Sequence, residues 1–299
     1  MMRLLSAIRN RTIWAWQGIL CFYARHFMNA PRILSVDETL NLIINERFSI
    51  SRNGDGELNI MMGMSIPFQN YDARLAAIMR EAHTTVLDRY LSCMPGYFNS
   101  YDNFNTKACT YFNNFLHKNR FAWTKLATAP LYGNAFISRF YIDYIDKSGS
   151  SQQVLRLKKI WEGQDVVLVE GMESKLGVNN DLFDGARRLK RILGPAENAF
   201  SVYDKLMDCV KKEAAKDGLI LLALGPTATA MAYELAKDGY WAVDIGHIDI
   251  EYEWMLMGAT CKVNVPGKYT NESTGDKIVG LIPQGELQKY ESQVITRIQ

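Results

Sequence analysis

The sequence lacks the features that define several common classes of protein. No apolar run reaches the roughly 18 residues of a membrane-spanning helix, and no internal repeat or low-complexity tract interrupts the 299 residues. The five cysteines are scattered and form no Cys-x-x-Cys pair. A zinc site or a disulfide framework is therefore not expected, and a reducing cytoplasm is the predicted setting. The net charge of +2 provides no global field for binding nucleic acid.

Two familiar phosphate-binding motifs are also absent, since the chain has neither a GxxxxGK[ST] loop nor a GxGxxG fingerprint. The second half of the chain does have a regular alternation of short apolar runs and helical patterns. It predicts strands at 165–170, 218–224 and 241–245, and helices at 152–162, 187–191, 200–216 and 226–238. Strand, helix and strand at this spacing predict an α/β fold, Rossmann-like, with a mostly parallel sheet flanked by helices.

The first thirty residues differ in composition from the rest. They contain Arg3, Arg9, Arg11 and Arg25, aromatic and aliphatic residues between them, and no acidic residue. We expect a cationic amphipathic helical extension over 1–32, followed by one domain over 33–299. Two interpretations of residues 1–30 remain open. The helix lies on the anionic inner face of a membrane as a peripheral contact, or it packs on the domain.

A candidate metal site follows a strand predicted to end at Arg52. The next residues include Asp55 and Glu57, separated by one glycine. If the backbone is extended there, both carboxylates point the same way. Carboxylate oxygens suit Mn²⁺ or Mg²⁺, which often bridge to substrate phosphates. The alternative is an ordinary Gly-Asp-Gly turn followed by a solvated glutamate.

Other candidates also follow predicted strands, where ligands bind in open α/β sheets. Glu170 ends the strand at 165–170. Pro226 and Thr227 open a helix whose first N–H groups would favour a phosphate.

A third group of candidates follows the strand at 241–245. His247, Asp249 and Glu251 share one face if this segment is extended, whereas His247 and Glu251 share a face if it is helical. They are candidates for a further metal ligand or a general base, and Asp249 is the preferred base. The alternative is an amphipathic segment with a solvated acidic side.

Several separate motifs in this order resemble the GT-D fold glycosyltransferases, a bacterial family formerly described as a domain of unknown function. The resemblance covers residues 35–275. Its motifs are Arg52-Asn-Gly-Asp-Gly-Glu57, Ser65-Ile-Pro-Phe68, Val169-Glu-Gly171, Lys175-Leu-Gly177, Asn180-Asp-Leu-Phe183, Ala223-Leu-Gly-Pro-Thr227, Asp244-Ile-Gly-His-Ile-Asp-Ile-Glu-Tyr-Glu-Trp254 and Gly267-Lys-Tyr-Thr-Asn-Glu272. The resemblance implies a metal-dependent DxE motif, here Asp55 and Glu57, that binds a nucleotide-sugar. The family usually has an aromatic residue where this chain has Asn53.

The resemblance implies a metal-dependent hexosyltransferase. It would move a sugar, with glucose as the first candidate, from a UDP-sugar to a glycan or glycoconjugate acceptor in bacterial polysaccharide or glycoprotein biosynthesis. Arg52, Arg139 and Lys175 are candidate phosphate or sugar contacts. Two rival interpretations remain open: a metal-dependent phosphohydrolase acting on a nucleotide or sugar phosphate, and a non-catalytic nucleotide-binding module.

Overall fold

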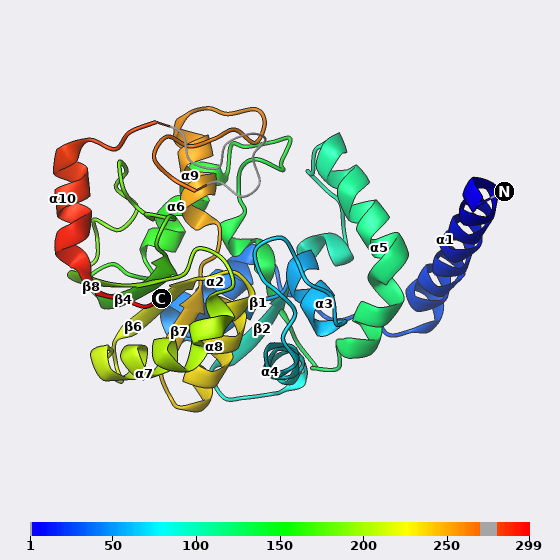
Figure 1. The fold of residues 1–299 in the computed structure, drawn as a ribbon, viewed down its shortest axis with the longest axis horizontal. Helices are drawn as coiled ribbons and strands as arrows, with labels where there is room; N and C mark the ends of the chain where they lie inside the picture. The colour runs from blue at the N-terminus through cyan, green and yellow to red at the C-terminus, as the bar shows by residue number, and fades with distance from the viewer. Residues whose placement is uncertain (1, 270–279) are drawn as a thin grey trace.

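The computed structural model describes residues 2–269 and 280–299, and for residues 2–8 the backbone alone. These ranges form one eight-stranded sheet with helices on both faces (Figure 1). The strand order is β3-β2-β1-β7-β6-β4-β5-β8, and every neighbouring pair runs parallel. The strands are β1 Ser49–Arg52, β2 Tyr90–Met94, β3 Gly133–Asn134, β4 Asp165–Gly171, β5 Arg188–Gly194, β6 Leu219–Ala223, β7 Trp241–Asp244 and β8 Val294–Arg297. The predicted α/β fold is confirmed.

Helices α1 and α2 precede the first strand, and the other helices lie in the connections between strands, as expected for parallel pairs. A capping box between Ser35 and Glu38 starts α2, as its sequence pattern predicts. The α-helices are α1 Met2–Phe27, α2 Val36–Glu46, α3 Asp55–Met61, α4 Ala73–Thr84, α5 Thr106–Leu126, α6 Ser150–Lys158, α7 Tyr203–Glu213, α8 Pro226–Lys237, α9 Ile248–Leu256 and α10 Gln284–Gln293.

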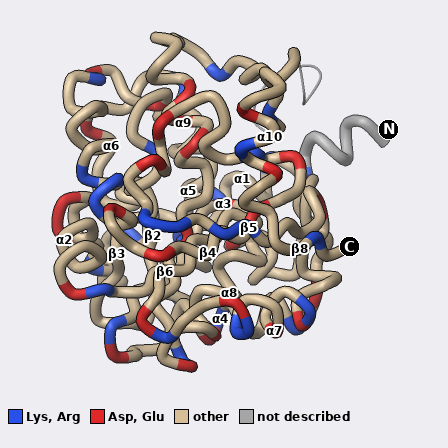
Figure 2. The backbone as a smooth tube through the Cα atoms, turned by 90° about the vertical axis from the view of Figure 1, so that its left-hand side faces the viewer, with Lys and Arg blue, Asp and Glu red and all other residues tan. Residues whose placement is uncertain are grey.

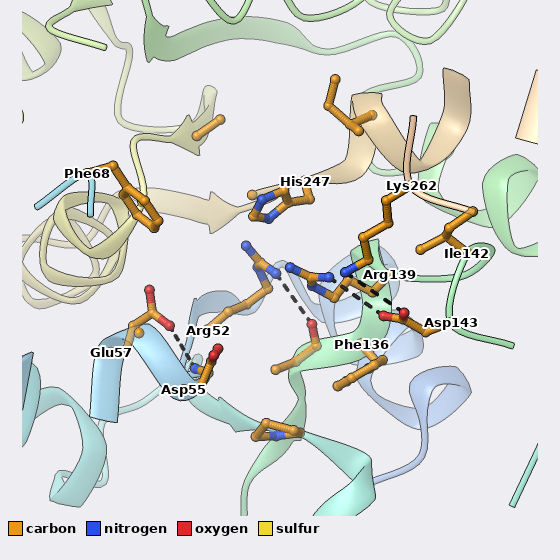
Figure 3. A pocket seen from close by; sticks show the side chains of 18 of the residues that line it. Arg52, Asp55, Glu57, Phe68, Phe136, Arg139, Ile142, Asp143, His247 and Lys262 are labelled. Carbon is orange, nitrogen blue, oxygen red and sulfur yellow. Dashed lines mark hydrogen bonds and ion pairs between the residues drawn. The ribbon is translucent and has the colours of Figure 1, made fainter. Parts of the chain in front are cut away.

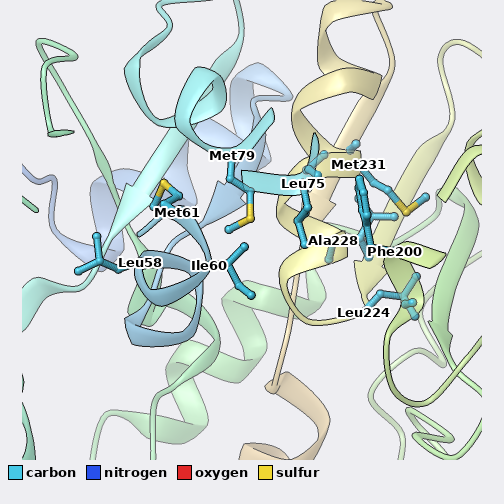
Figure 4. Close-up of a cluster of buried hydrophobic side chains, with 14 of the residues drawn as sticks. Leu58, Ile60, Met61, Leu75, Met79, Phe200, Leu224, Ala228 and Met231 are labelled. Atoms are coloured by element: carbon cyan, nitrogen blue, oxygen red, sulfur yellow. The ribbon is translucent and has the colours of Figure 1, made fainter. Parts of the chain in front are cut away.

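Strand β6 shows why the central strands are apolar throughout. Leu219 and Leu221 belong to the core that contains residues of α2, α6 and α9. Ile220 and Leu222 belong to the core on the other face, with residues of α4, α7 and α8. Figure 4 shows the part of this second core where α3, α4 and α8 meet. Because both faces of the sheet are covered, these four residues are all buried, and no polar alternation appears in this part of the sequence.

The strand order indicates where a ligand would bind. Strands β1, β2 and β3 form one side of the sheet and β4, β5, β6 and β8 the other, with β7 joining the two through its pairing with β1. All carboxyl ends lie along one edge, because all pairs are parallel. The chain reverses its direction of strand addition near β1 and β7, and such switch points are where open α/β sheets bind ligands.

The prediction of a helix over 187–191 is wrong, because residues 188–191 begin strand β5. Residues 188–194 pair in register with all of β4, and Arg191 is buried because it forms an ion pair with Glu170 on β4 at 2.5 Å. Lys190 pairs with Glu213 at the end of α7. In the sequence these basic residues resemble the solvated face of a helix. In the structure Lys190 and Arg191 are neutralised by carboxylates that are distant along the chain.

Helix α1 packs against α5, and the prediction of an N-terminal helix is confirmed. A membrane-spanning helix has to be both long and apolar. None of the helices in 2–269 and 280–299 combines the length and apolar content needed to cross a membrane. In the view of Figure 2, basic and acidic residues are interspersed along the described part of the chain. The segment 270–272 of the last family motif lies outside the described residues.

Candidate active site

A cavity of about 880 Å³ opens along the carboxyl edge of the sheet. Segments that follow β1, β2, β3, β4, β5, β6 and β7 all contribute to its wall. Six of the predicted site residues line this cavity: Arg52, Asp55, Glu57, Arg139, His247 and Asp249. Figure 3 shows that Asp55 and Glu57 lie on one side of the cavity and Arg139 and Asp143 on the other, with Arg52 and His247 between them.

Asp55 and Glu57 lie in the first turn of helix α3. The expectation of an extended backbone between them is therefore wrong. The turn forms because Glu57 Oε2 accepts the N–H of Gly54 at 2.8 Å, which satisfies a free donor at the helix start. The Tyr111 hydroxyl of α5 donates to Asp55 Oδ2. Positions two apart on a helix do not share a face, yet both residues line the cavity, where Glu57 turns back toward Gly54, and both lie at the favourable end of the helix dipole.

The electrostatics of this pair suit a divalent cation. Burial raises the pKa of Glu57 to about 7, and the nearby carboxylates of Asp244 and Asp55 contribute to this rise. A cation would reverse that effect by favouring the ionised form. Mg²⁺ and related ions are usually held by one or two carboxylates and fill their other positions with water and substrate phosphates. Asp55 and Glu57 fit this pattern, although within the described part of the chain no three His, Cys, Asp or Glu side chains gather into a metal-binding group.

Arg52 is fixed at the cavity wall by Asp244 on the neighbouring strand. Its Nε and Nη2 donate to Asp244 Oδ1 at 3.2 and 3.1 Å, and its backbone N–H donates to Asp244 Oδ2. Thr229 of α8 also donates to that carboxylate. Gly246, with φ +42°, lies against the guanidinium, and a Cβ there would overlap Arg52. Asp244 and Gly246 therefore hold this cation in place and were not among the predicted site residues.

Position 53, beside Arg52, is an asparagine where the family usually has an aromatic residue. The Asn53 side chain is fully buried and donates from Nδ2 to Ser92 Oγ at 2.9 Å and to the carbonyl of Cys93 at 3.2 Å. The residue thereby ties the end of β1 to β2. The departure from the family pattern leaves both carboxylates of the following helix at the cavity.

His247 precedes helix α9, and the segment that follows it is helical rather than extended. Of the two arrangements left open by the sequence, the helical one is therefore observed. His247 lines the cavity, and Figure 3 places its imidazole beside Arg52.

Asp249 borders the same cavity but is only 2% exposed, and both of its oxygens are engaged. Oδ1 accepts from the backbone N–H of Gly177 and from Asn180, and Oδ2 accepts from Lys268 at 2.7 Å. Lys268 is fully buried and also pairs with Glu253. Because these donors already occupy both oxygens of Asp249, the geometry gives His247 the better access to a substrate hydroxyl. The general base itself stays a prediction.

Glu251 does not line the cavity. Its Oε2 accepts the backbone N–H groups of Tyr141 and Ile142, at 2.9 and 3.1 Å. Burial raises its pKa to about 7. Its carboxyl group therefore supports the segment that carries Arg139 and Asp143 into the cavity wall.

Glu251→Gln is expected to change how stability depends on pH. The raised pKa means that the stabilisation from the bound proton is complete below pH 4.5 and is lost as the pH rises through 7. A glutamine cannot ionise, so between these values the variant should gain about 3 kcal/mol relative to the parent chain. Thermal unfolding across this window measures the difference, with exposed Glu46→Gln as the control. A difference that stays constant with pH would contradict the assignment.

Four other predicted residues lie behind the cavity wall rather than in it. Glu170 pairs with Arg191, and Lys175 donates to the carbonyl of Gly267 at 3.3 Å. Thr227 is fully buried and donates to Gln69 Oε1, and Pro226 is buried at the start of α8. Gly225, immediately before them, does line the cavity. The geometry gives these four side chains a supporting role.

The sequence did not identify Phe68 as a site residue, although it lies in one of the family motifs. Its ring lines the cavity next to Gly225, whose φ is +55° and whose added Cβ would lie 3.0 Å from that ring. Asn198 fixes the loop, because its N–H donates to the Phe68 carbonyl and its Oδ1 accepts from Asn70. An aromatic ring held this firmly at a cavity wall offers a surface on which a flat ring can stack.

Comparisons with known proteins agree with this geometry. The chain is 39% identical over 267 residues to "Probable glycosyl transferase Gly" of Streptococcus gordonii and 40% identical over 268 residues to "Glycosyltransferase GlyD" of Streptococcus pneumoniae serotype 4. Each match covers 89% of this chain but only 39% and 32% of the relatives, which are much longer.

Solved structures are similar over nearly the whole fold. One, described as a new glycosyltransferase from Streptococcus sanguinis, has a TM-score of 0.84 at 38% identity and covers 90% of this chain and 100% of its own. Another, described as a domain of unknown function with a distinct glycosyltransferase fold, has a TM-score of 0.84 at 39% identity and covers 96% and 100%. The family model "Glycosyltransferase GT-D fold" matches residues 50–273. The chain therefore belongs to the GT-D fold glycosyltransferases.

Proposed function

We propose that this chain is a metal-dependent hexosyltransferase that moves a sugar, with glucose as the first candidate, from a UDP-sugar to a glycan or glycoconjugate acceptor. The observation that carries the proposal is that Asp55, Glu57 and Arg52 all line one cavity of about 880 Å³. Two carboxylates that would hold a divalent metal ion, together with a fixed arginine, are groups suited to binding a sugar diphosphate. The setting proposed is bacterial polysaccharide or glycoprotein biosynthesis in the cytoplasm, where the five free thiols would stay reduced.

Asp55 and Glu57 would hold Mn²⁺ or Mg²⁺, which supplies Lewis-acid stabilisation of the departing diphosphate. Arg52 faces the same region and would stabilise the negative charge that develops on the leaving group. Because Asp244 and Gly246 already fix its position, no reorganisation is needed during the reaction. His247 is the candidate that would accept the proton of the acceptor hydroxyl.

Phe68 would bind the base of the nucleotide by stacking. It lies on the side of the cavity that the segments after β5 and β6 also line, through Asn198 and Gly225. Arg139 lies on the opposite side of the cavity (Figure 3). Donor and acceptor would therefore approach the metal site from different ends of the cavity.

A screen of UDP-, GDP- and dTDP-sugars with and without Mn²⁺ tests this function. A ligand that binds only the folded chain raises its melting temperature. We expect a Mn²⁺-dependent rise with a UDP-sugar, and release of UDP that increases when an acceptor is added. Turnover that is indifferent to acceptors would instead support a phosphohydrolase. Binding that needs no metal and gives no turnover would support a nucleotide-binding module.

A further inference from the structure

One face of helix α1 packs against helix α5 of the domain. Trp14 stacks on His117 of α5 with ring centroids 3.9 Å apart, and its carbonyl lies 3.1 Å from His117 Nε2. Gly18 allows this close approach, because a Cβ there would lie 3.1 Å from the His117 ring. Ala24, on the same side, is only 2% exposed. The helix is therefore seated on α5 through small and flat side chains.

The opposite face of α1 is apolar and largely exposed, although Tyr23 on it also contacts Phe121 of α5, with ring centroids 6.4 Å apart. At about 3.6 residues per turn, positions 16, 19, 23 and 27 fall on one stripe, with position 22 beside it. Large apolar side chains occupy all five, and the exposed fractions are 60% for Trp16, 58% for Ile19, 59% for Phe22, 49% for Tyr23 and 69% for Phe27. Tyr23 and Phe27 stack on each other at 5.5 Å.

The charges of α1 indicate what covers this face. Exposed Arg9 and Arg11 lie at the two edges of the stripe by helical position, exposed Arg25 lies further round the helix, and residues 1–30 contain no acidic side chain. Two copies of the helix brought face to face would place these cations together, which disfavours self-association. An apolar aromatic stripe flanked by arginines matches the interface of an anionic bilayer, where the rings enter the acyl boundary and the arginines meet the headgroups.

We propose that α1 anchors the protein to the surface of an anionic phospholipid membrane, lying in the plane of the interface with Trp16, Ile19, Phe22 and Phe27 inserted. The opposite face stays on α5, so the domain remains attached to the lipid surface through that helix. This inference is independent of the proposed sugar transfer, because none of these side chains lines the cavity.

Co-sedimentation of the full chain with vesicles tests the anchor. We expect binding to vesicles in which about a third of the lipid is phosphatidylglycerol and weak binding to phosphatidylcholine alone. The triple variant Trp16→Ser, Ile19→Ser and Phe22→Ser should lower partitioning by more than roughly tenfold. Arg9→Gln with Arg11→Gln and Arg25→Gln should remove most of the preference for the anionic lipid.

A matched control for the apolar triple variant removes three exposed apolar side chains that lie outside α1. The triple variant Val86→Ser, Leu155→Ser and Leu281→Ser, at positions 73%, 62% and 93% exposed, should bind vesicles as the parent chain does. Donor turnover without lipid should be the same in all variants. An equal loss in the control, no binding by the parent chain, or lipid-free dimers that depend on Trp16, Ile19 and Phe22 would each overturn the proposal.

Discussion

Asp55→Asn is expected to lower sugar transfer by roughly a hundred- to a thousandfold, and Glu57→Gln should do the same. Each substitution keeps the size of the side chain but removes a charge that would hold the divalent cation. The helix start should persist in Glu57→Gln, because an amide oxygen can still accept the N–H of Gly54. Initial rates with a saturating UDP-sugar measure the loss of transfer, and Mn²⁺ titrations of the same variants measure the loss of metal binding.

The matched control for this pair is Asp204→Asn. Asp204 lies at the surface, where it pairs with Arg74 at 2.6 Å, and exposed ion pairs contribute little to stability. Its variant should keep full activity and the same requirement for Mn²⁺. Full activity in either Asp55→Asn or Glu57→Gln, at unchanged metal concentration, would remove the basis of the proposed function.

Gly246→Ala is expected to lower transfer by roughly a hundredfold or more, because displacing a catalytic group by about 1 Å has effects of that size. The new Cβ would occupy the space of the Arg52 guanidinium, which Asp244 prevents from moving freely. A left-handed conformation also costs an alanine about 1 kcal/mol. The rate with a UDP-sugar and the melting temperature should therefore both fall.

The variant Gly239→Ala separates the effect of displacing Arg52 from the effect of backbone strain. Gly239 also has a positive φ, +78°, but nothing lies within 4 Å of its added Cβ. This variant should lose a similar amount of stability to backbone strain while keeping its activity. If both variants transfer sugar equally well, the position of Arg52 does not matter for the reaction.

The elements that sequence predicted well are those whose burial is uniform. Strands β4, β6 and β7 are short apolar runs because both faces of the sheet are covered. Strand β5 was missed because its cations are neutralised by Glu170 and Glu213, residues 21 and 23 positions away along the chain. Local periodicity carries no information about such partners, so a charged buried strand resembles an exposed helical face.

The same limit applies to the site. Asp55 and Glu57 were predicted because a local motif contains them. Their helical conformation was not predicted. The pairing of Arg52 with Asp244 spans 192 positions and has no local signature. One signal was available, since Asp244 lies near the carboxyl end of the strand predicted at 241–245, and the carboxyl ends of parallel strands share an edge. Phe68 was missed because an aromatic residue in a loop has no periodic pattern that separates a cavity wall from a core.

Helix α5 connects two features that have been described separately. Tyr111 lines the cavity, whereas Phe121 and His117 contact α1. Ten residues of helix, from 111 to 121, span about 15 Å. With α1 resting on lipid, its packing on α5 would hold the cavity at a fixed position relative to the bilayer surface. Acceptors would then have to meet the cavity at that position.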